Sequence, residues 1–204
     1  NSAAIVWGGS YCYATWFSAN PMHIQGINLL PMNPTGFYLA GNKDYITENI
    51  RLAYKYAKQG GFNEMEWFDI WCEYQALEDP QAAMERWEAQ ADSYSVEGGE
   101  TKAHTYQFIR SLIEHGTPDT SITSDTALST VFVKDGVKTY AAYNAEDTAK
   151  TVTFSDGAAI TARPHTLTTV AQDELENVSS YKIEYYKQNV SGTGYEKEVV
   201  TKQT

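Results

Sequence analysis

The sequence contains little cysteine, and this limits the kinds of fold and site that it can form. Only Cys12 and Cys72 occur among its 204 residues, which is too few for a disulfide framework or for a cysteine-based metal site. Two alternatives remain for the pair. They can form a bridge in an oxidising compartment, or they can stay free and pack as small hydrophobic side chains, which is the commoner behaviour of buried cysteine.

Positive charge is also scarce, and no apolar run is long enough to cross a membrane. The chain has 15 Lys and Arg against 26 Asp and Glu, which gives a net charge of -11. Its basic residues form no cluster that could neutralise phosphates, so we expect no nucleic-acid partner. No run of about 18 apolar residues occurs, so no membrane span is expected. Asn1 is not an initiator methionine and the apolar run 3–7 follows it closely, which indicates a segment of a longer protein.

Motifs for metal or cofactor chemistry are lacking as well. The histidines have no metal-ligand spacing to one another or to cysteine, so a zinc site is not expected. A Gly-rich phosphate loop and a serine nucleophile elbow are also missing. We therefore expect neither a cofactor nor a metal. The histidines are His23, His104, His115 and His165.

Aromatic residues, in contrast, are abundant and make up 13% of the chain. Many of them fall in the first 40 residues, in a segment that is also rich in Gly, Ser and Asn. Aromatic faces stack on sugar rings, and Asn, Gln and His side chains hydrogen-bond sugar hydroxyls, so this long segment is a candidate carbohydrate-binding loop. The alternative is that the rings fill the middle of a helical array. Both interpretations stay open.

Hydrophobic periodicity predicts helices from the start of the chain to about residue 118. Consecutive helices of this kind suit a packed helical array or an α/α toroid. The second helix is apolar nearly all round, so we expect it to be buried. The expected helices begin at a cap residue Asp44 and end near Gly60, span about 64–78, run from Asp79-Pro80 to about 91, and occupy about 101–115. The residues expected to face inward from the last helix are Tyr106, Ile109, Leu112 and Ile113.

After residue 118 the pattern alternates with a period of two, as in β-strands. Asp135-Gly136 lies between residues 130–133 and 138–143 and predicts a hairpin with a two-residue turn. Further strands are expected at 150–154, 158–162, 166–170, 181–186 and 195–200. The predicted fold class is mixed α and β. Its predicted parts are helical residues 1–118, an antiparallel β segment at 119–172, a polar linker at 173–180 and a partial β repeat at 181–204.

Paired carboxyl groups are the usual signature of a glycosidase, and Asp69 and Glu73 have suitable spacing. They are one helical turn apart, so their Cβ atoms would lie about 5–6 Å apart on one helix face. Glycosidases use carboxyl separations of about 5–9.5 Å. Acidic residues at helical spacing are usually solvated surface charges, however. We therefore expect a solvated pair without a catalytic role, and the same for Glu64, Glu66 and Glu78.

A series of short motifs occurs in a fixed order along the chain. The first are Trp7, Thr15-Trp16-Phe17, Ile24-Gln25-Gly26-Ile27, and Leu30-Pro31 with Pro34. The stretches WCEYQALEDPQAA, TYQFIRSLIEHG and TYAAYNAEDTAKTVTFSDG follow them. In this order the motifs resemble the segment after the catalytic glutamates in glycoside hydrolase family 81. The resemblance covers residues 1 to about 170.

This resemblance implies endo-hydrolysis of β-1,3-glucan by inversion, in the cleft of an α/α toroid and without a metal in the chemistry. The family's catalytic glutamate motif and its partner aspartate lie upstream of Asn1, so we assign no catalytic residue within this chain. Many members have His where this chain has Gln25, so sugar contacts at that position are expected to differ. The residues expected to bind the glucan are Trp7, Tyr13, Trp16, His23 and Gln25.

The tail at residues 181–204 resembles the opening of a small β-grasp-like repeat of Gram-positive surface proteins. This implies a secreted or cell-surface attached parent with several domains. Two other functions remain open: a non-catalytic glucan-binding or adhesion module, and another toroid-fold glycosidase or lyase that acts on a different polysaccharide. A paired-glutamate motif before Asn1 would distinguish the first interpretation from both.

Overall fold

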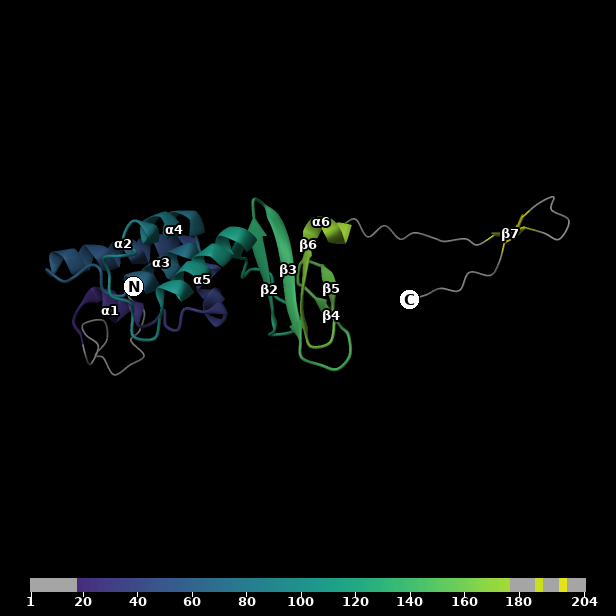
Figure 1. Cartoon of the computed structure of the whole chain (residues 1–204), viewed down its shortest axis with the longest axis horizontal. Helices are drawn as coiled ribbons and strands as arrows, with labels where there is room; N and C mark the ends of the chain where they lie inside the picture. Colours follow the sequence, from purple (N-terminus) through teal and green to yellow (C-terminus); the bar gives the residue numbers. More distant parts are fainter. Residues whose placement is uncertain (1–17, 177–185, 189–194, 198–204) are drawn as a thin grey trace. The chain divides into compact units, whose positions relative to one another are not determined.

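The computed structural model describes residues 18–176, 186–188 and 195–197. By its internal contacts the chain divides into two units, residues 1–172 and residues 173–204. Figure 1 labels most of the helices and strands along the chain. Among the described residues, no helix is both long and apolar enough to cross a membrane.

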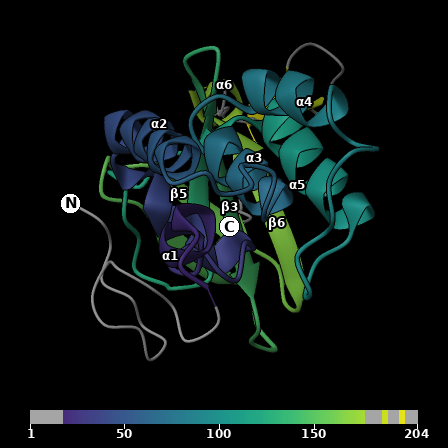
Figure 2. The ribbon, with the colours of Figure 1, turned by 90° about the vertical axis from the view of Figure 1, so that its left-hand side faces the viewer.

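Helices form the first part of the larger unit, and α3 lies at their centre. This helix packs against α2, α4 and α5, and the last two also pack against each other (Figure 2). All its residues except Gln75 are buried, as the apolar pattern around the whole helix predicted. The elements of this part are α1 (Pro21–Gly26), the 3-10 helix η1 (Pro34–Gly41), α2 (Lys43–Gln59), α3 (Phe68–Ala76), α4 (Pro80–Glu88) and α5 (Lys102–His115).

Side-chain caps begin five of these helices, including the 3-10 helix, and in α2 the cap is a residue other than the predicted one. Helix α4 begins at the predicted cap, where Asp79 Oδ1 accepts a hydrogen bond from Ala82 N at 2.9 Å. Helix α2 begins earlier than expected, because Asn42 Oδ1 accepts a hydrogen bond from Tyr45 N at 3.1 Å. Asp44 is therefore not the cap. It lies in the first turn of α2, where its negative charge suits the helix dipole.

The inward face of α5 differs from the prediction at one position. Ile109 and Leu112 are buried as expected, and Ile113 is partly buried against the core. Tyr106 is 39% exposed, however, whereas Phe108 is 7% exposed and belongs to the core. Phe108, Ile109 and Leu112 follow one stripe along the helix, and Tyr106 falls beside it. The prediction that Tyr106 faces inward was therefore wrong.

An antiparallel sheet follows the helices, with strand order β1-β2-β3-β6. Strands β4 and β5 form a separate antiparallel pair. Asp135 and Gly136 have φ of 52° and 81°, as a two-residue hairpin turn requires, so the predicted hairpin is confirmed. The strands are β1 (Thr117–Pro118), β2 (Ser129–Lys134), β3 (Val137–Asn144), β4 (Lys150–Thr153), β5 (Ala159–Ala162) and β6 (Thr166–Ala171).

The smaller unit contains one antiparallel pair among its described residues, β7 (Tyr186–Gln188) with β8 (Tyr195–Lys197). The strands predicted at 181–186 and 195–200 also include residues 181–185 and 198–200, which lie outside the described residues. The segment predicted as a polar linker begins within a short helix, α6 (Gln172–Glu176). Acidic residues in its first turn suit the helix dipole.

Two hydrogen bonds and one aromatic contact join the sheet to the helices. Lys134 Nζ in β2 donates to the carbonyl oxygen of Glu114 in α5 at 3.1 Å. Lys43 Nζ in α2 donates to Thr117 Oγ1 in β1 at 2.8 Å. The rings of Phe37 and Phe132 also meet edge to face, with centroids 5.6 Å apart. The predicted mixed α and β fold with an antiparallel sheet is thus confirmed.

We predict that Gly116→Ala destabilises the full-length protein by roughly 3 kcal/mol or more. Gly116 connects α5 to β1 with φ of 94°, and an added Cβ would lie 2.3 Å from the carbonyl oxygen of Val133. Gly157→Ala is the matched control, because its φ is 93° and no atom lies within 4 Å of the added Cβ. Thermal unfolding of both variants measures the difference. Equal losses would contradict a role for the contact with Val133.

Candidate functional site

The structure describes two of the residues predicted to bind glucan, His23 and Gln25, whereas Trp7, Tyr13 and Trp16 lie outside the described residues. His23 and Gln25 both belong to α1, but they are two positions apart and therefore lie on different faces of the helix. Gln25 is 9% exposed and largely enclosed. His23 is the one that meets other polar groups, so the structure brings His23 and not Gln25 to the candidate site.

His23 joins residues from a distant part of the chain. Its Nδ1 lies 2.7 Å from Ser18 Oγ, and its Nε2 lies 3.4 Å from Glu66 Oε2. The ring centroids of His23 and Trp67 are 4.8 Å apart. We call Ser18, His23, Glu66 and Trp67 the His23 cluster. The Glu66 side chain is 40% exposed, so the cluster reaches the protein surface.

Helix α1 is held directly against α3, and this fixes the position of the cluster. Trp71 in α3 donates from Nε1 to the carbonyl oxygen of Met22 in α1 at 3.3 Å. A Cβ at Gly26 would lie 2.9 Å from Cε3 of Trp67, so the backbone of α1 touches the Trp67 ring. Glycine at this position therefore permits the close approach of helix and ring.

Trp67 has a left-handed backbone conformation, with φ of 52° and ψ of 36°. This conformation is rare for a large side chain. It persists only where the surroundings enforce it, and it is frequent at functional sites. The left-handed residue also prevents a helix from passing through it, so α3 begins at Phe68 and is shorter than the predicted helix at 64–78.

The electrostatics of the cluster favour a neutral ligand. Burial lowers the pKa of His23 below its usual value of 6.5, although the neighbouring Glu66 opposes part of this change. The imidazole is therefore neutral at pH 7. A neutral imidazole donates from one nitrogen and accepts at the other. Beside the Trp67 ring the imidazole thus adds no fixed positive charge, and this suits a ligand with hydroxyl groups better than an anion.

Asp69 and Glu73 are both 0% exposed, so the prediction of a solvated pair was wrong. Helix α3 is covered on every side and leaves no solvated face for them. Asp69 Oδ2 accepts a hydrogen bond from Glu97 N at 2.9 Å. Burial raises the pKa of Glu73 to about 9. Because a polysaccharide cannot reach an enclosed carboxyl group, this pair cannot supply glycosidase chemistry.

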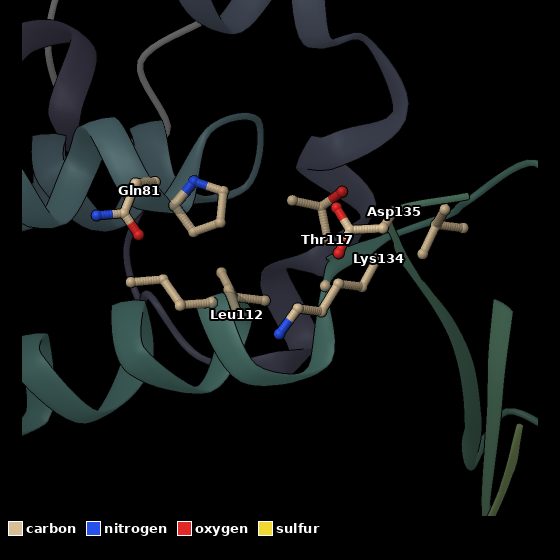
Figure 3. A pocket seen from close by; sticks show the side chains of 9 residues that line it. Gln81, Leu112, Thr117, Lys134 and Asp135 are labelled. Carbon is tan, nitrogen blue, oxygen red and sulfur yellow. The ribbon is translucent and has the colours of Figure 1, made fainter. Parts of the chain in front are cut away.

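A hollow of about 350 Å³ lies where the start of α4, the end of α5 and strands β1 and β2 meet. Figure 3 shows Gln81 and Leu112 on one side of it and Thr117, Lys134 and Asp135 on the other. The residues that line it all belong to the described part of the chain, and none of them is aromatic. It therefore lacks the ring surface that small-molecule sites commonly use, and the His23 cluster is the better candidate.

Glu66 and Trp67 were not predicted as site residues, because the apolar period placed both within one helix at 64–78. The available signal was the turn composition just before them. Gly60-Gly61 and Asn63 form a turn-like segment, and such a segment interrupts a helical period. The prediction extended the helix too close to this turn.

We predict that the titration of Glu73 makes the protein less stable as the pH rises from about 5 to 8. The measurement uses a buffer with EDTA, so that bound metal ions do not affect the result. A glutamate in water has a pKa of 4.5, and burial raises the pKa of Glu73 in the folded protein to about 9. Between these values the unfolded chain releases a proton that the folded protein retains, so a higher pH favours unfolding. Glu73→Gln removes this titration, and it should exceed the parent protein in stability by about 2–3 kcal/mol at pH 7.

Denaturant unfolding at pH 4.5 and pH 7 tests this expectation. The lower pH equals the usual pKa of a glutamate, so the advantage of Glu73→Gln should be small there. Asp92→Asn, which removes an exposed carboxyl group outside the helices, is the control and should show no such trend. An effect of Glu73→Gln that is equal at both pH values would contradict the raised pKa.

The comparisons with known proteins all point to one family. The model of the glycosyl hydrolase family 81 C-terminal domain matches residues 1–106. A glucan endo-1,3-beta-D-glucosidase of Acetivibrio thermocellus is 40% identical over 176 residues, which is 86% of this chain and 22% of the relative. A protein of the same name from Thermobifida fusca is 38% identical over 165 residues, which is 81% of this chain and 21% of the relative.

A solved structure agrees with these relatives. It is a mutant of a glycoside hydrolase family 81 protein from Clostridium thermocellum, with a TM-score of 0.71 and 40% identity over 81% of this chain and 22% of that chain. This chain thus spans about a fifth of the length of the proteins that it matches. The resemblance inferred from the ordered motifs is confirmed, and the chain belongs to glycosyl hydrolase family 81.

Proposed function

We propose that this chain is part of a secreted or cell-surface endo-β-1,3-glucanase and supplies a wall of the substrate cleft. The observation that carries this proposal is 40% identity, over 86% of the chain, to a protein named glucan endo-1,3-beta-D-glucosidase. In this proposal the helices α1 to α5 are the C-terminal part of an α/α toroid. The complete protein cuts internal β-1,3-glucosidic bonds with inversion.

The His23 cluster supports a sugar-binding role for this wall. A β-1,3-glucan carries hydroxyl groups and no charge, so its recognition depends on ring contacts and hydrogen bonds. Trp67 supplies a ring, with the imidazole of His23 beside it, and the partly exposed carboxyl group of Glu66 supplies hydrogen-bond acceptors. The other proposed binding residues are Trp7, Tyr13 and Trp16, which lie in the same N-terminal segment as His23.

The catalytic acids of the proposed reaction belong to the part of the protein before Asn1. Inversion needs two carboxyl groups about 6.5–9.5 Å apart, one to protonate the leaving oxygen and one to activate water. Asp69 and Glu73 do not meet this need, because both are enclosed. The chain therefore contributes to binding the glucan, and acid–base chemistry supplied upstream cleaves it.

We expect Trp67→Ala in the full-length protein to raise the KM for laminarin about 5- to 30-fold with a smaller change in kcat. The reason is the loss of ring contact with the sugar, worth about 1–2 kcal/mol. Tyr38→Ala is the matched control, because Tyr38 is an aromatic residue that is 70% exposed and lies outside the cluster. Circular dichroism checks that both variants fold. Equal KM values in the two variants would overturn the role of Trp67.

Reducing-sugar release from laminarin, measured for the full-length protein and for the 204-residue chain, tests the position of the acids. We expect activity in the full-length protein, with the α-anomer formed first, and none in the chain alone. Activity in the chain alone would contradict the upstream position of the acids. Binding without cleavage by the full-length protein would favour an adhesion module instead.

A further inference from the structure

A second group of titratable side chains lies where α3 meets the start of α5, apart from the His23 cluster. Glu73 belongs to α3, Glu100 precedes α5, and His104 lies in the first turn of α5. One ligand atom from each of these side chains lies within 4.8 Å of the other two. Helices α3 and α5 pack against each other, and Figure 2 shows them side by side.

Glu73 lacks the hydrogen-bond partners that a buried carboxyl group normally has. Its side chain is 0% exposed, and neither carboxyl oxygen makes a hydrogen bond of ordinary geometry. The Thr105 hydroxyl close by donates instead to the carbonyl oxygen of Thr101 at 3.3 Å. Glu73 Oε1 faces His104 Nδ1 at 3.5 Å, and this nitrogen also makes no hydrogen bond of ordinary geometry.

Carboxyl groups outnumber imidazole rings in this group. Glu100 Oε2 approaches the same Nδ1 of His104, so two carboxyl groups converge on one ring nitrogen. One imidazole holds at most one positive charge against these carboxyl groups, whereas a divalent cation would neutralise two of them.

We propose that Glu73, Glu100 and His104 form a binding site for a divalent metal ion of the zinc type. Zinc binds imidazole nitrogen and carboxylate oxygen at about 2.0–2.2 Å, so tetrahedral ligand atoms lie about 3.3 Å apart. The separation of 3.5 Å between His104 Nδ1 and Glu73 Oε1 is close to this value. The imidazole ligand distinguishes the site from the all-oxygen sites that calcium and magnesium prefer.

The site is closed on one side and open on the other. The exposed fractions of the side chains are 0% for Glu73, 11% for Glu100 and 39% for His104. A metal ion can enter past His104 and keep a water molecule as its fourth ligand. Bound there, it ties α3 to the first turn of α5 and gives Glu73 a partner. This role is structural and does not depend on the proposed glucanase function.

Calorimetric titration of the full-length protein with zinc chloride, after treatment with EDTA and dialysis, tests the proposal. We expect Glu73→Gln and His104→Gln each to bind one equivalent of zinc fewer per chain than the parent protein. His165→Gln is the matched control and should lose none, because His165 lies in an exposed ion pair with Asp147. Zinc should also raise the Tm of the parent protein more than that of Glu73→Gln. The Tm in EDTA shows that each variant is folded.

Unchanged zinc stoichiometry in Glu73→Gln would overturn the proposal, and so would the absence of zinc binding to the parent protein. In the second case the contacts of His104 with the two carboxyl groups hold the helices together, and His104→Gln lowers the Tm in EDTA. Zinc-edge X-ray absorption should show nitrogen and oxygen ligands alone at this site. A sulfur ligand at about 2.3 Å would overturn the ligand assignment, because none of the three proposed ligands contains sulfur.

Discussion

Helix α3 is enclosed by α2, α4 and α5, and most features of the helical part depend on this enclosure. The indole of Trp71 holds α1 from within the core, so the N-terminal helix takes its position from α3. The same enclosure removes two carboxyl groups from water, and each then needs a partner or a proton. Asp69 accepts a backbone hydrogen bond from Glu97, whereas Glu73 faces a histidine and a further carboxyl group.

Local rules predicted most of the helices and strands, because the interactions that begin and end them act within a few residues. The cap at Asp79 and the turn at Asp135-Gly136 are of this kind. Predictions failed where contacts between distant elements decide which side chains are buried. Tyr106 and Phe108 are both aromatic and both helical, and the packing of α5 on its neighbours selects Phe108 for the core. A single helix's period contains too little information to make that choice.

Only part of the candidate site, the segment around His23, was predictable from the sequence. The motif around His23 indicated a polar, ring-rich segment, but Glu66 and Trp67 come from the segment just before α3 and meet it through the fold. Helical spacing places a residue on a face of its own helix and does not say what covers that face. For this reason Asp69 and Glu73 were expected in water, although the neighbouring helices enclose both.

Gly26 and Gly116 limit how this sequence can diverge over evolutionary time. At Gly116 a methyl group would meet the backbone of β2, which cannot yield as a side chain can. At Gly26 it would meet the ring of Trp67, so a larger residue is tolerated only if the ring is replaced or moved. Position 116 is therefore expected to remain glycine in any descendant that keeps this sheet on this helix. Positions 26 and 67 are expected to change together.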